Sequence, residues 1–317
     1  MIKNKISILI PCYNGGQFLK NSIKSVLNQT YKNFILFLID NGSTDNSYEV
    51  MKYYKNKDKR IKIIKFSKKT SKGKSVNKVI KKCNTKLIAI LDADDIYFKK
   101  KIYKQLVYLN KHPEVEALGT LANYINVDNN LSAGVSSSNL TNHNSCFKFI
   151  NKNKTINIFT PTAIFSRKIF LKVGGFRDEY WPADDTDLWT RIAEKGHIVY
   201  TLPEILISYR IHANSITTSN FMDSRLKAMW VKENLILRNI NHKEISFSKF
   251  KKKYLNKNIY IKIQEYTDSV SDLYFRNSIV YLINKNYILF IVNLFISSLF
   301  APIRFLKKTL KRIKNLL

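Results

Sequence analysis

The sequence predicts an α/β protein whose sheet is largely parallel. Apolar, β-branched runs alternate with segments of helical periodicity, as in consecutive βαβ units. The 317 residues are 45% hydrophobic, enough to bury one α/β core of roughly 200 residues and an appendage. The apolar runs are "ISILI" (6–10), "FILFLI" (34–39), "IKIIKF" (61–66) and "LIAIL" (87–91).

The elements follow one another in a regular order. A helix is expected after each run, at 17–29, 45–55, 75–83 and about 99–111. Residues 115–165 contain an Asn/Ser-rich interval, which indicates a hairpin or flexible loop between further strands. "PADDTDLWTRIAEKG" predicts a helix with Pro and acids in its first turn, followed by extended chain in "HIVYTLPEILISYRIH". From about residue 221 the chain reads as helical and basic.

Charge and cysteines limit the function classes. Lys+Arg 54 against Asp+Glu 23 gives +31, which favours an anionic partner: nucleic acid, an acidic membrane or a phosphorylated substrate. A Lys-rich, solvated surface is the alternative. Cys12, Cys83 and Cys146 lack disulfide or metal-ligand spacing, which suits a reducing cytosol. The first apolar run is short and lacks a cleavage site, so we interpret it as a strand rather than a signal peptide.

Polar motifs follow three of the apolar runs. "PCYNGG", "DNGSTD" and "DADD" should meet at the carboxyl edge of the sheet, where open α/β proteins bind ligands. Asp92, Asp94 and Asp95 would repel one another there unless a cation lay among them. Asp92 and Asp94 share one side of an extended chain and suit Mg²⁺ or Mn²⁺ with substrate phosphates. Capping of the next helix is the alternative.

These motifs occur within a longer series of matching segments. The chain resembles family 2 glycosyltransferases of the GT-A fold over roughly residues 5–215, on the motifs "ISILIPCYNG", "LIDNGSTDNS", "SKGKSVNKVI", "LDADD", "TPTAIFSRKIFLKVGGF", "DDTDLW" and "YRIHANSIT". The resemblance implies a Rossmann-like nucleotide-binding fold with a mixed sheet flanked by helices. It also implies a non-processive, inverting transferase that uses a UDP-sugar and Mn²⁺ or Mg²⁺.

The resemblance suggests a division of the chain into regions. We expect a catalytic domain over residues 1–220, with a nucleotide-binding part to about 115 and an acceptor part from about 116. Residues 221–317 would form a helical region with a basic, membrane-associating tail.

The resemblance also assigns residues to the donor. Those implied at the nucleotide are Pro11, Tyr13, Asn14, Asp40, Asn41, Lys74, Asn77, Asp92 and Ala93. Asn41 stands where many relatives have a second acid, and its carbonyl can still accept a hydrogen bond from a base. For the segment around Asp40, a turn and helix cap is the alternative.

Metal binding is implied for two acids and one histidine. Asp94 matches the metal ligand of the family's D-x-D motif, and Asp92 is directed to the ribose or to a metal-bound water. His212 resembles a histidine that approaches the metal or diphosphate in relatives, and an ordinary surface histidine is the alternative.

The acceptor half of the reaction needs a base. "ADDTDLW" resembles the family's Glu-Asp motif, which makes Asp185 the base and Asp184 its supporting neighbour, one methylene shorter than the usual Glu. Compensation of the helix dipole is the alternative. Trp181 and Tyr180 are candidates for an apolar platform against an acceptor sugar, or else core residues.

The C-terminal segment indicates a membrane surface. The apolar run 287–300 is shorter than the ~20 residues that a spanning helix needs. In the following helix, Ile303, Leu306, Leu310, Ile313 and Leu317 recur at 3- and 4-residue intervals among lysines, which suits an anionic leaflet. Packing on the catalytic domain, or a homo-oligomer through these helices, is the alternative. We therefore expect a cytoplasmic enzyme, peripheral on the inner face of the membrane.

The expected function is transfer of one hexose or N-acetylhexosamine from a UDP-sugar to a hydroxyl of a glycan or lipid-linked acceptor, in lipopolysaccharide or capsule synthesis. Processive synthases resemble one another in transmembrane helices and a Gln-x-x-Arg-Trp motif, which this chain lacks. A sugar nucleotidyltransferase would need a Gly-rich, basic first loop where "PCYNGG" stands. A nucleic-acid-binding protein, the third alternative, would need a recognisable binding module, and none is found.

Overall fold

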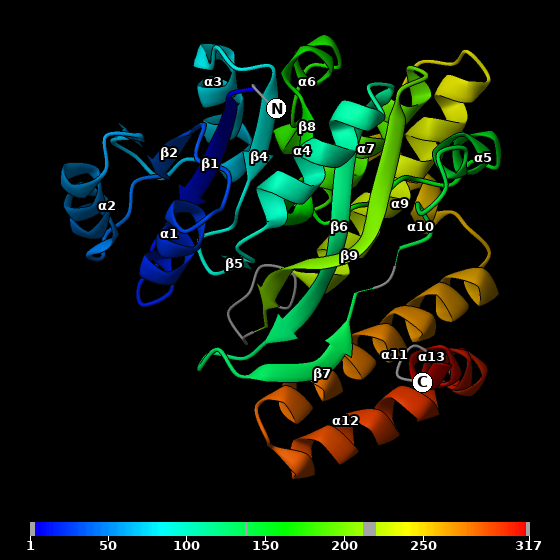
Figure 1. Cartoon of the computed structure of the whole chain (residues 1–317). Helices are drawn as coiled ribbons and strands as arrows, with labels where there is room; N and C mark the ends of the chain where they lie inside the picture. The colour runs from blue at the N-terminus through cyan, green and yellow to red at the C-terminus, as the bar shows by residue number, and fades with distance from the viewer. Residues whose placement is uncertain (1–3, 137, 212–219, 315–317) are drawn as a thin grey trace. The chain divides into compact units, whose positions relative to one another are not determined.

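The computed structural model describes residues 4–136, 138–211 and 220–314, with the backbone alone at 131–133 and 311–314. It confirms the predicted mixed α/β sheet flanked by helices (Figure 1). The strands are β1 Ile6–Cys12, β2 Phe34–Asp40, β3 Ile61–Lys65, β4 Leu87–Ile90, β5 Ile96–Tyr97, β6 Val115–Ile125, β7 Leu131–Val135, β8 Ile164–Ser166 and β9 Ile198–Arg210.

The helices lie close to the predicted segments. Those of the first two thirds are α1 Leu19–Leu27, α2 Ser47–Lys57, α3 Lys72–Lys82, α4 Lys101–Lys111, α5 Ser145–Asn151, α6 Arg167–Lys172 and α7 Asp184–Glu194, with 3₁₀ turns η1 Thr160–Thr162 and η2 Asp178–Tyr180. The C-terminal helices are α9 Phe221–Asn239, α10 Phe247–Leu255, α11 Ile259–Ile283, α12 Tyr287–Phe300 and α13 Pro302–Lys314.

The sheet has the order β3-β2-β1-β4-β8-β6-β9-β5, with β7 paired to β6. β1 to β4 are mutually parallel, whereas β8 runs antiparallel to both β4 and β6. Parallel pairing thus joins β1 to β4, the strands of three consecutive βαβ units. The chain from Asn126 to Asn130 turns β6 into β7, within the Asn/Ser-rich interval.

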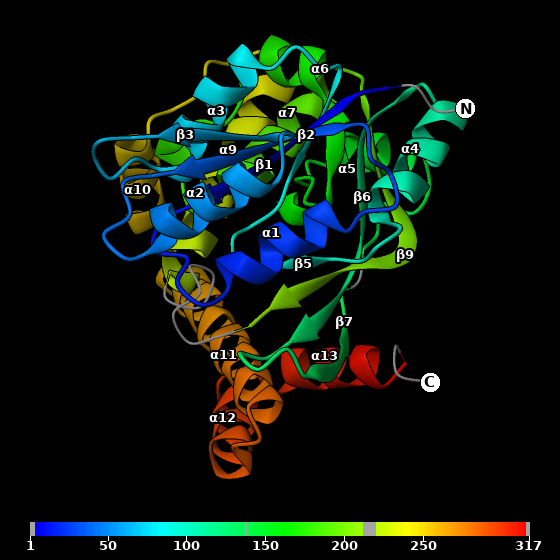
Figure 2. The same cartoon turned by 60° about the vertical axis from the view of Figure 1, so that its left-hand side comes forward.

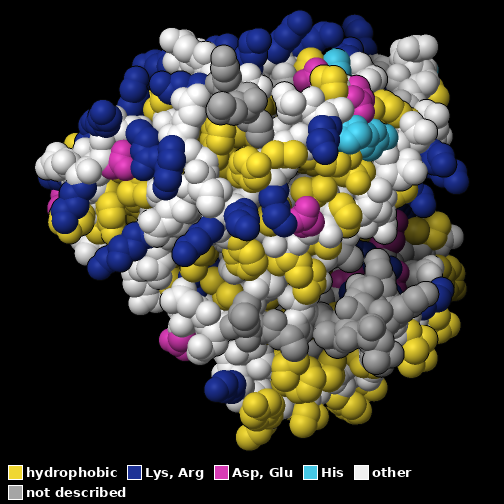
Figure 3. Space-filling view, viewed as in Figure 1, with side chains coloured by type: hydrophobic (Ala, Val, Ile, Leu, Met, Phe, Trp, Pro, Cys, Tyr) yellow, Lys and Arg dark blue, Asp and Glu magenta, His cyan; other side chains and the backbone are white. Residues whose placement is uncertain are grey.

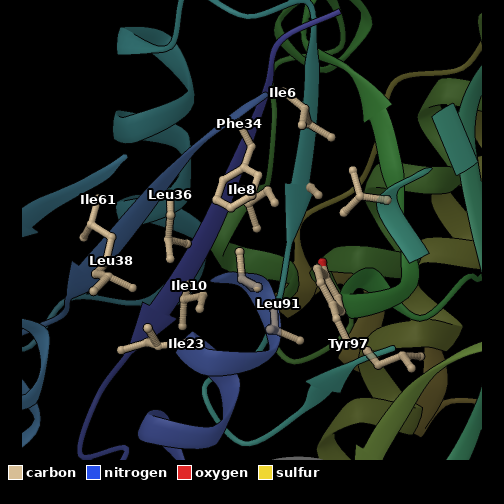
Figure 4. Close-up of a cluster of buried hydrophobic side chains, with 14 of the residues drawn as sticks. Ile6, Ile8, Ile10, Ile23, Phe34, Leu36, Leu38, Ile61, Leu91 and Tyr97 are labelled. Atoms are coloured by element: carbon tan, nitrogen blue, oxygen red, sulfur yellow. The ribbon is translucent and has the colours of Figure 1, made fainter. Parts of the chain in front are cut away.

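Both faces of the central strand β1 are buried, so its sequence is apolar at nearly every position instead of alternating. One face carries Ile6, Ile8 and Ile10, which pack with side chains of α1, α2 and neighbouring strands (Figure 4). Ile23 of α1 and Leu38 of β2 belong to this cluster. Helices α1 and α2 lie together on one side of the parallel strands (Figure 2). This packing fixes where the strands end, and hence where their loops meet.

Contacts divide the chain into two compact units. The first holds residues up to Asn123 and Ser136–Tyr209, and the second holds Tyr124–Val135 with the described part of Arg210–Leu317. The acids that follow β4 and those that begin α7 belong to the first unit.

The second unit is built on the α11–α12 hairpin, which α13 completes. Ser271 of α11 and Ser297 of α12 exchange buried hydroxyl-to-carbonyl hydrogen bonds of 2.8 Å. Asp272 accepts hydrogen bonds from Arg304 at 2.7 Å and also pairs with Lys308 and Arg225. These ion pairs tie α13 and α9 to the hairpin.

Candidate active site

The first two polar motifs meet at the carboxyl edge of the parallel strands. Asn14, with φ 51°, accepts a hydrogen bond from the Thr44 N–H at 2.8 Å through its side-chain carbonyl. The Gly15 N–H donates to the Ser47 hydroxyl at 2.9 Å, and the Gly16 N–H donates to Asp45 at 3.0 Å. The loops after β1 and β2 are thus bonded into one rigid rim.

The third motif joins the same rim. A Cβ added at Gly15 would lie 3.5 Å from the Ala93 Cβ and 2.6 Å from the Cys12 Sγ. Only glycine permits this approach without movement. The Ala93 carbonyl is in turn held by the Ser22 hydroxyl at 2.8 Å. The predicted convergence of the three motifs is confirmed.

Two buried acceptors lie at the end of β2. Asp40 and Asn41 are buried, and Asp40 Oδ1 accepts from the Ser43 N–H at 2.8 Å. Among the described residues, Asp40 Oδ2 and Asn41 Oδ1 find no hydrogen-bond donor. An unsatisfied buried acceptor costs about 1–3 kcal/mol, so a ligand that donates to both would recover this free energy. Both atoms therefore suit the donor groups of a nucleoside.

Pro11 and Tyr13 flank the same edge. Pro11 is buried at the end of β1, paired in register with Ile39 of β2. The Tyr13 ring is exposed, with the Lys69 ammonium 4.5 Å from its centroid. This ring offers a flat face for a planar ligand.

A lysine supplies positive charge among the acids that follow β4, and the sequence motifs did not indicate it. Lys72, the first residue of α3, forms an ion pair with Asp92. Burial by itself lowers the pKa of Lys72, but the charge and hydrogen bond of Asp92, with Asp184 and Asp185 behind them, raise it above its ordinary range. Lys72 stands four residues before the buried Val76, on the sheet-facing side of α3, and this spacing was the available signal.

Lys74 and Asn77 both join α3 to the segment before α7, through different contacts. Lys74 pairs with Asp178 at 2.9 Å, and Asp178 also accepts from the Ser71 hydroxyl. Burial alone would raise the pKa of Asp178, yet these two partners hold it below its usual value. The Asn77 side chain bonds the Phe176 backbone at both ends, at 2.7 and 3.0 Å. Asn77 therefore joins α3 to the turn before α7, and nucleotide contact by Asn77 or Lys74 stays a prediction.

The first turn of α7 brings Asp184 and Asp185 to this region. A Cβ at Gly73 of α3 would lie 3.5 Å from Asp184 Oδ2, so the two helix starts are adjacent. Burial, then the charge of Asp185, raises the pKa of Asp184 to about 7. Burial also raises the pKa of Asp185, while the Thr186 N–H at 2.7 Å and Lys72 oppose the rise. Burial therefore disfavours the charged form of both carboxylates, and Lys72 partly offsets this effect.

The raised pKa of Asp184 predicts a pH-dependent stability. Its carboxyl has a model value of 3.8 and a folded value of about 7, so the free energy of unfolding should fall as pH rises between them. Asp184→Asn removes this decline. At pH 8 its free energy of unfolding should exceed that of the parent by about 1–4 kcal/mol, after allowance for solvent screening. Urea denaturation at pH 5 and pH 8 measures this. Asp223→Asn, an exposed acid of α9, should show no such change, and an Asp184→Asn advantage equal at both pH values would contradict the assignment.

Asp187 holds the α7 acids in place. Its side chain is fully buried between Arg177 and Arg191, with the Nε of each 2.9 Å from Oδ2. Arg191 also donates to the Gly175 carbonyl at 2.7 Å, which ties the double-glycine turn to α7. Asp187 is thus structural.

Removing this buried charge should be costly. Asp187→Asn leaves two arginines without a counter-charge and is expected to lower the free energy of unfolding by about 3–5 kcal/mol. Asp223→Asn should change it by less than about 0.5 kcal/mol. Chemical denaturation of both variants tests this. If Asp187→Asn lowers the free energy of unfolding by less than about 1 kcal/mol, the ion pairs of Asp187 with the two arginines contribute little.

The acceptor candidates differ in exposure. Trp181 is 39% exposed, whereas Tyr180 is 1% exposed and its ring is covered by the Arg177 guanidinium at 4.3 Å. Tyr180 is therefore packed within the protein, and only Trp181 of the two offers a surface. His212 lies outside the described residues.

A divalent cation fits the β4 edge by the chemistry of its donors. Asp92 and Asp94 supply only hard oxygen atoms, and Asp184 and Asp185 add further negative charge. Crowded carboxylates raise each other's pKa unless positive charge neutralises them, which Lys72 does in part. Asp92 pairs with Lys72, and metal binding by Asp94 stays a prediction.

The curled, mixed sheet flanked by helices has the GT-A fold, which its structural neighbours share. The family model described as Glycosyl transferase family 2 matches residues 7–174, which is more than half of the chain. The chain therefore belongs to this family. Asp184 and Asp185 lie beyond the matched segment.

Individual relatives agree with this assignment. An uncharacterised glycosyltransferase of Methanocaldococcus jannaschii is 30% identical over 213 residues, covering 67% of this chain and 72% of its own. The O-antigen biosynthesis glycosyltransferase WbnJ of Escherichia coli is 30% identical over 228 residues, covering 69% and 84%.

Solved structures share the fold. TarS 1–349 of S. aureus in complex with UDP-GlcNAc has a TM-score of 0.59 at 14% identity, over 93% of this chain and 91% of that one. This chain spans 54% of another, longer TarS structure. The mannosyltransferase PcManGT of Pyrobaculum calidifontis, in complex with GDP-Man and Mn²⁺, has a TM-score of 0.57 at 16% identity, over 74% and 64%.

Proposed function

We propose that this glycosyltransferase inverts the anomeric centre as it moves one sugar from a UDP-sugar to a hydroxyl of a glycan or lipid-linked glycan in cell-surface polysaccharide synthesis. The observation that carries the proposal is the rim that joins two unsatisfied buried acceptors, at Asp40 and Asn41, to the acids of β4 and α7. The two buried acceptors suit a nucleoside, and the acids suit a diphosphate with its cation.

The donor proposal rests on hydrogen-bond complementarity. Asp40 Oδ2 suits a ribose hydroxyl, and Asn41 Oδ1 suits the imide N–H of uracil, because each acceptor is buried and requires a donor. The Tyr13 ring offers a face to the base. TarS, which shares the fold, is described in complex with UDP-GlcNAc, and PcManGT with GDP-Man, so the base is a point to test.

The acceptor would be activated by Asp185. Its carboxylate takes the proton of the acceptor hydroxyl while that oxygen attacks the anomeric carbon opposite the diphosphate. The bond from that carbon to the diphosphate oxygen breaks, and the diphosphate keeps the electron pair. Asp184, with a pKa of about 7, would support and orient its neighbour.

Positive charge for the leaving diphosphate would come from two sources. Asp94, with Asp92 beside it, would hold Mn²⁺ or Mg²⁺, which when bound stabilises the developing charge. Lys72 supplies a permanent ammonium at the same place. No separate acid is then needed for the leaving group.

The proposed pathway draws on WbnJ, a similar protein named for O-antigen biosynthesis. A lipid-linked acceptor would favour an enzyme held at the membrane, on its cytoplasmic face. Within the described residues, none of the helices has the length and apolarity needed to cross a bilayer.

An apolar surface on the second unit supports attachment to a membrane. The exposed side chains of α12 and α13 that form this apolar face are Tyr287, Ile288, Leu289, Ile291, Val292, Phe295, Leu299, Phe300, Ile303, Leu306 and Leu310. Figure 3 shows hydrophobic side chains gathered over the lower helices, α11 and α12 of Figure 1. Arg304 and Lys308 turn inward to Asp272, while Lys307 is exposed. An anionic lipid surface matches both the apolar face and the net charge of +31.

Point variants test the membrane proposal better than truncation, because removing α12 and α13 would leave Asp272 without two of its partners. Ile291→Ser with Phe295→Ser should reduce binding to vesicles rich in phosphatidylserine by about tenfold or more, since each residue buries apolar area in the lipid. Cosedimentation measures this. Tyr103→Ser, which removes an exposed aromatic from α4, should leave binding unchanged. Unchanged binding by the double variant, or a shift from dimer to monomer instead, would contradict lipid attachment.

The proposed activity is tested with a panel of UDP- and GDP-sugars, Mn²⁺ and glycan acceptors. Released nucleotide diphosphate and the configuration of the product are measured. A UDP-sugar should be turned over with inversion. Turnover of GDP-sugars alone would contradict the base assignment, and a product of retained configuration would contradict the mechanism.

A further inference from the structure

Three potential metal ligands meet outside the active site. His112 follows the end of α4, Glu114 immediately precedes β6, and His143 precedes α5. One ligand atom from each lies within 4.8 Å of the other two. None of these residues takes part in the chemistry described above.

Two of the three ligand pairs in this group have the spacing of a coordination shell. Each histidine Nδ1 lies 3.3 Å from the same oxygen, Oε1 of Glu114. Charge-assisted hydrogen bonds are shorter, about 2.7–2.9 Å. Two ligands of a tetrahedral Zn²⁺, each about 2.05 Å from the ion, are about 3.3 Å apart. Both nitrogen-to-oxygen pairs are thus longer than an optimal ion pair and have the ligand spacing of a tetrahedral site, and all three ligand atoms lie within 4.8 Å of one another.

Neighbouring aromatic residues orient the imidazoles. The Tyr108 hydroxyl lies 2.7 Å from Nε2 of His143, so its oxygen can accept a hydrogen bond from the Nε2–H, which leaves Nδ1 with a free electron pair. The His112 ring packs on Tyr108 at 4.4 Å, and Tyr200 stacks on Tyr108 at 5.2 Å with an interplanar angle of 3°. Tyr200 belongs to a buried cluster with Val115 and Leu118, so the support is rigid.

The strand register separates this group from the catalytic acids. Ala117 of β6 is level with Phe165 of β8, which is level with Ile88 of β4. Because β6 and β4 run the same way, Glu114 lies toward the amino end of the strands and Asp92 lies beyond the carboxyl end. An ion here would not touch the sugar donor.

We propose that His112, Glu114 and His143 bind one transition-metal ion of the Zn²⁺ type, with a fourth position open to water. Two imidazoles select Zn²⁺, Co²⁺, Ni²⁺ or Cu²⁺ over Mg²⁺, in contrast to the oxygen donors of the β4 edge. The ion would join the end of α4, the start of β6 and the segment before α5. Both histidines would bind the ion as neutral imidazoles.

Zinc titration of the tag-free, chelator-treated protein against a chromophoric indicator tests this site. We expect one equivalent bound with a dissociation constant of about 10⁻⁶ M or tighter, and a loss of about 100-fold or more in His112→Ala with His143→Ala. His242 is an exposed histidine of the second unit. His242→Ala and Asp94→Ala should both still bind one equivalent of zinc. Co²⁺ should give the visible absorption of a four-coordinate ion in the parent and in both control variants, but not in the double histidine variant.

Binding that survives the double histidine variant would overturn the site, as would parent binding weaker than about 10⁻⁴ M. Loss of the equivalent in Asp94→Ala alone would place the ion at the β4 acids instead. Thermal unfolding of the metal-free variants, expected to match the metal-free parent, shows that the loss does not come from unfolding. Sugar transfer is not a readout here, so the site and the proposed activity can fail separately.

Discussion

Asp185→Asn is expected to lower the turnover of the sugar donor with acceptor by about 10²–10⁴, or about 3–5 kcal/mol of barrier. The amide keeps the shape of the carboxylate and can still accept from the Thr186 N–H, but it cannot take the proton of the acceptor hydroxyl. Binding of UDP with Mn²⁺ should stay within about twofold of the parent, because no donor contact is assigned to Asp185.

Asp223→Asn, on the surface of α9, is the matched control and should retain full turnover. Asp184→Asn separates the roles of the pair, because a supporting residue should cost less than the base itself. Turnover is measured as nucleotide diphosphate released in the presence of acceptor, with UDP binding by calorimetry. Near-parent turnover of Asp185→Asn would remove Asp185 from the mechanism.

Asp94→Ala is expected to abolish the part of UDP affinity that depends on metal. Positive charge between the acids and the diphosphate contributes several kcal/mol, so affinity with Mn²⁺ should fall by about 100-fold or more, to the value measured without metal. Binding without metal should change little, since Asp40, Asn41 and Lys72 are intact. Calorimetry with and without Mn²⁺ separates the two contributions.

Asp178→Asn is a useful comparison for Asp94→Ala because it removes a nearby negative charge that pairs with Lys74 and Ser71 instead of facing the β4 acids. The gain in UDP affinity on adding metal should persist in Asp178→Asn. An Asp94→Ala protein that binds UDP and Mn²⁺ like the parent would show that the metal is held elsewhere or is not used.

Much of the fold follows from local sequence patterns. The alternation of apolar runs with helical segments predicted β1 to β4 and their helices, because burial on both faces leaves a continuous apolar signature. The antiparallel half was harder to predict. β5 has two residues and β8 has three, too few for any period, and their pairing depends on contacts distant in sequence.

The site was predictable where it depends on strand ends and not where it depends on side-chain direction. Convergence of the three motifs follows from parallel topology. Lys72 was missed because charge alone does not distinguish it from Lys74, and only its place on the buried stripe of α3 does. Similarly, burial of Tyr180 next to exposed Trp181 reflects the stacking of Arg177, which no local pattern indicates.

The tail shows the same limit. A helical repeat of apolar residues in α13 was recognised, but which face turns to the protein was not determined by it. Asp272, more than 30 residues away in sequence, draws Arg304 and Lys308 inward and so leaves Ile303, Leu306 and Leu310 exposed. Long-range ion pairing therefore decided an orientation that periodicity left open.

The most direct test of the central claim is a crystal structure with UDP and Mn²⁺, in which anomalous scattering locates the metal. We expect Mn²⁺ bound to Asp94 and to the diphosphate, with the uracil or ribose donating to Asn41 Oδ1 and Asp40 Oδ2. UDP bound away from these atoms, or manganese absent from Asp94 while UDP occupies the rim, would contradict the account.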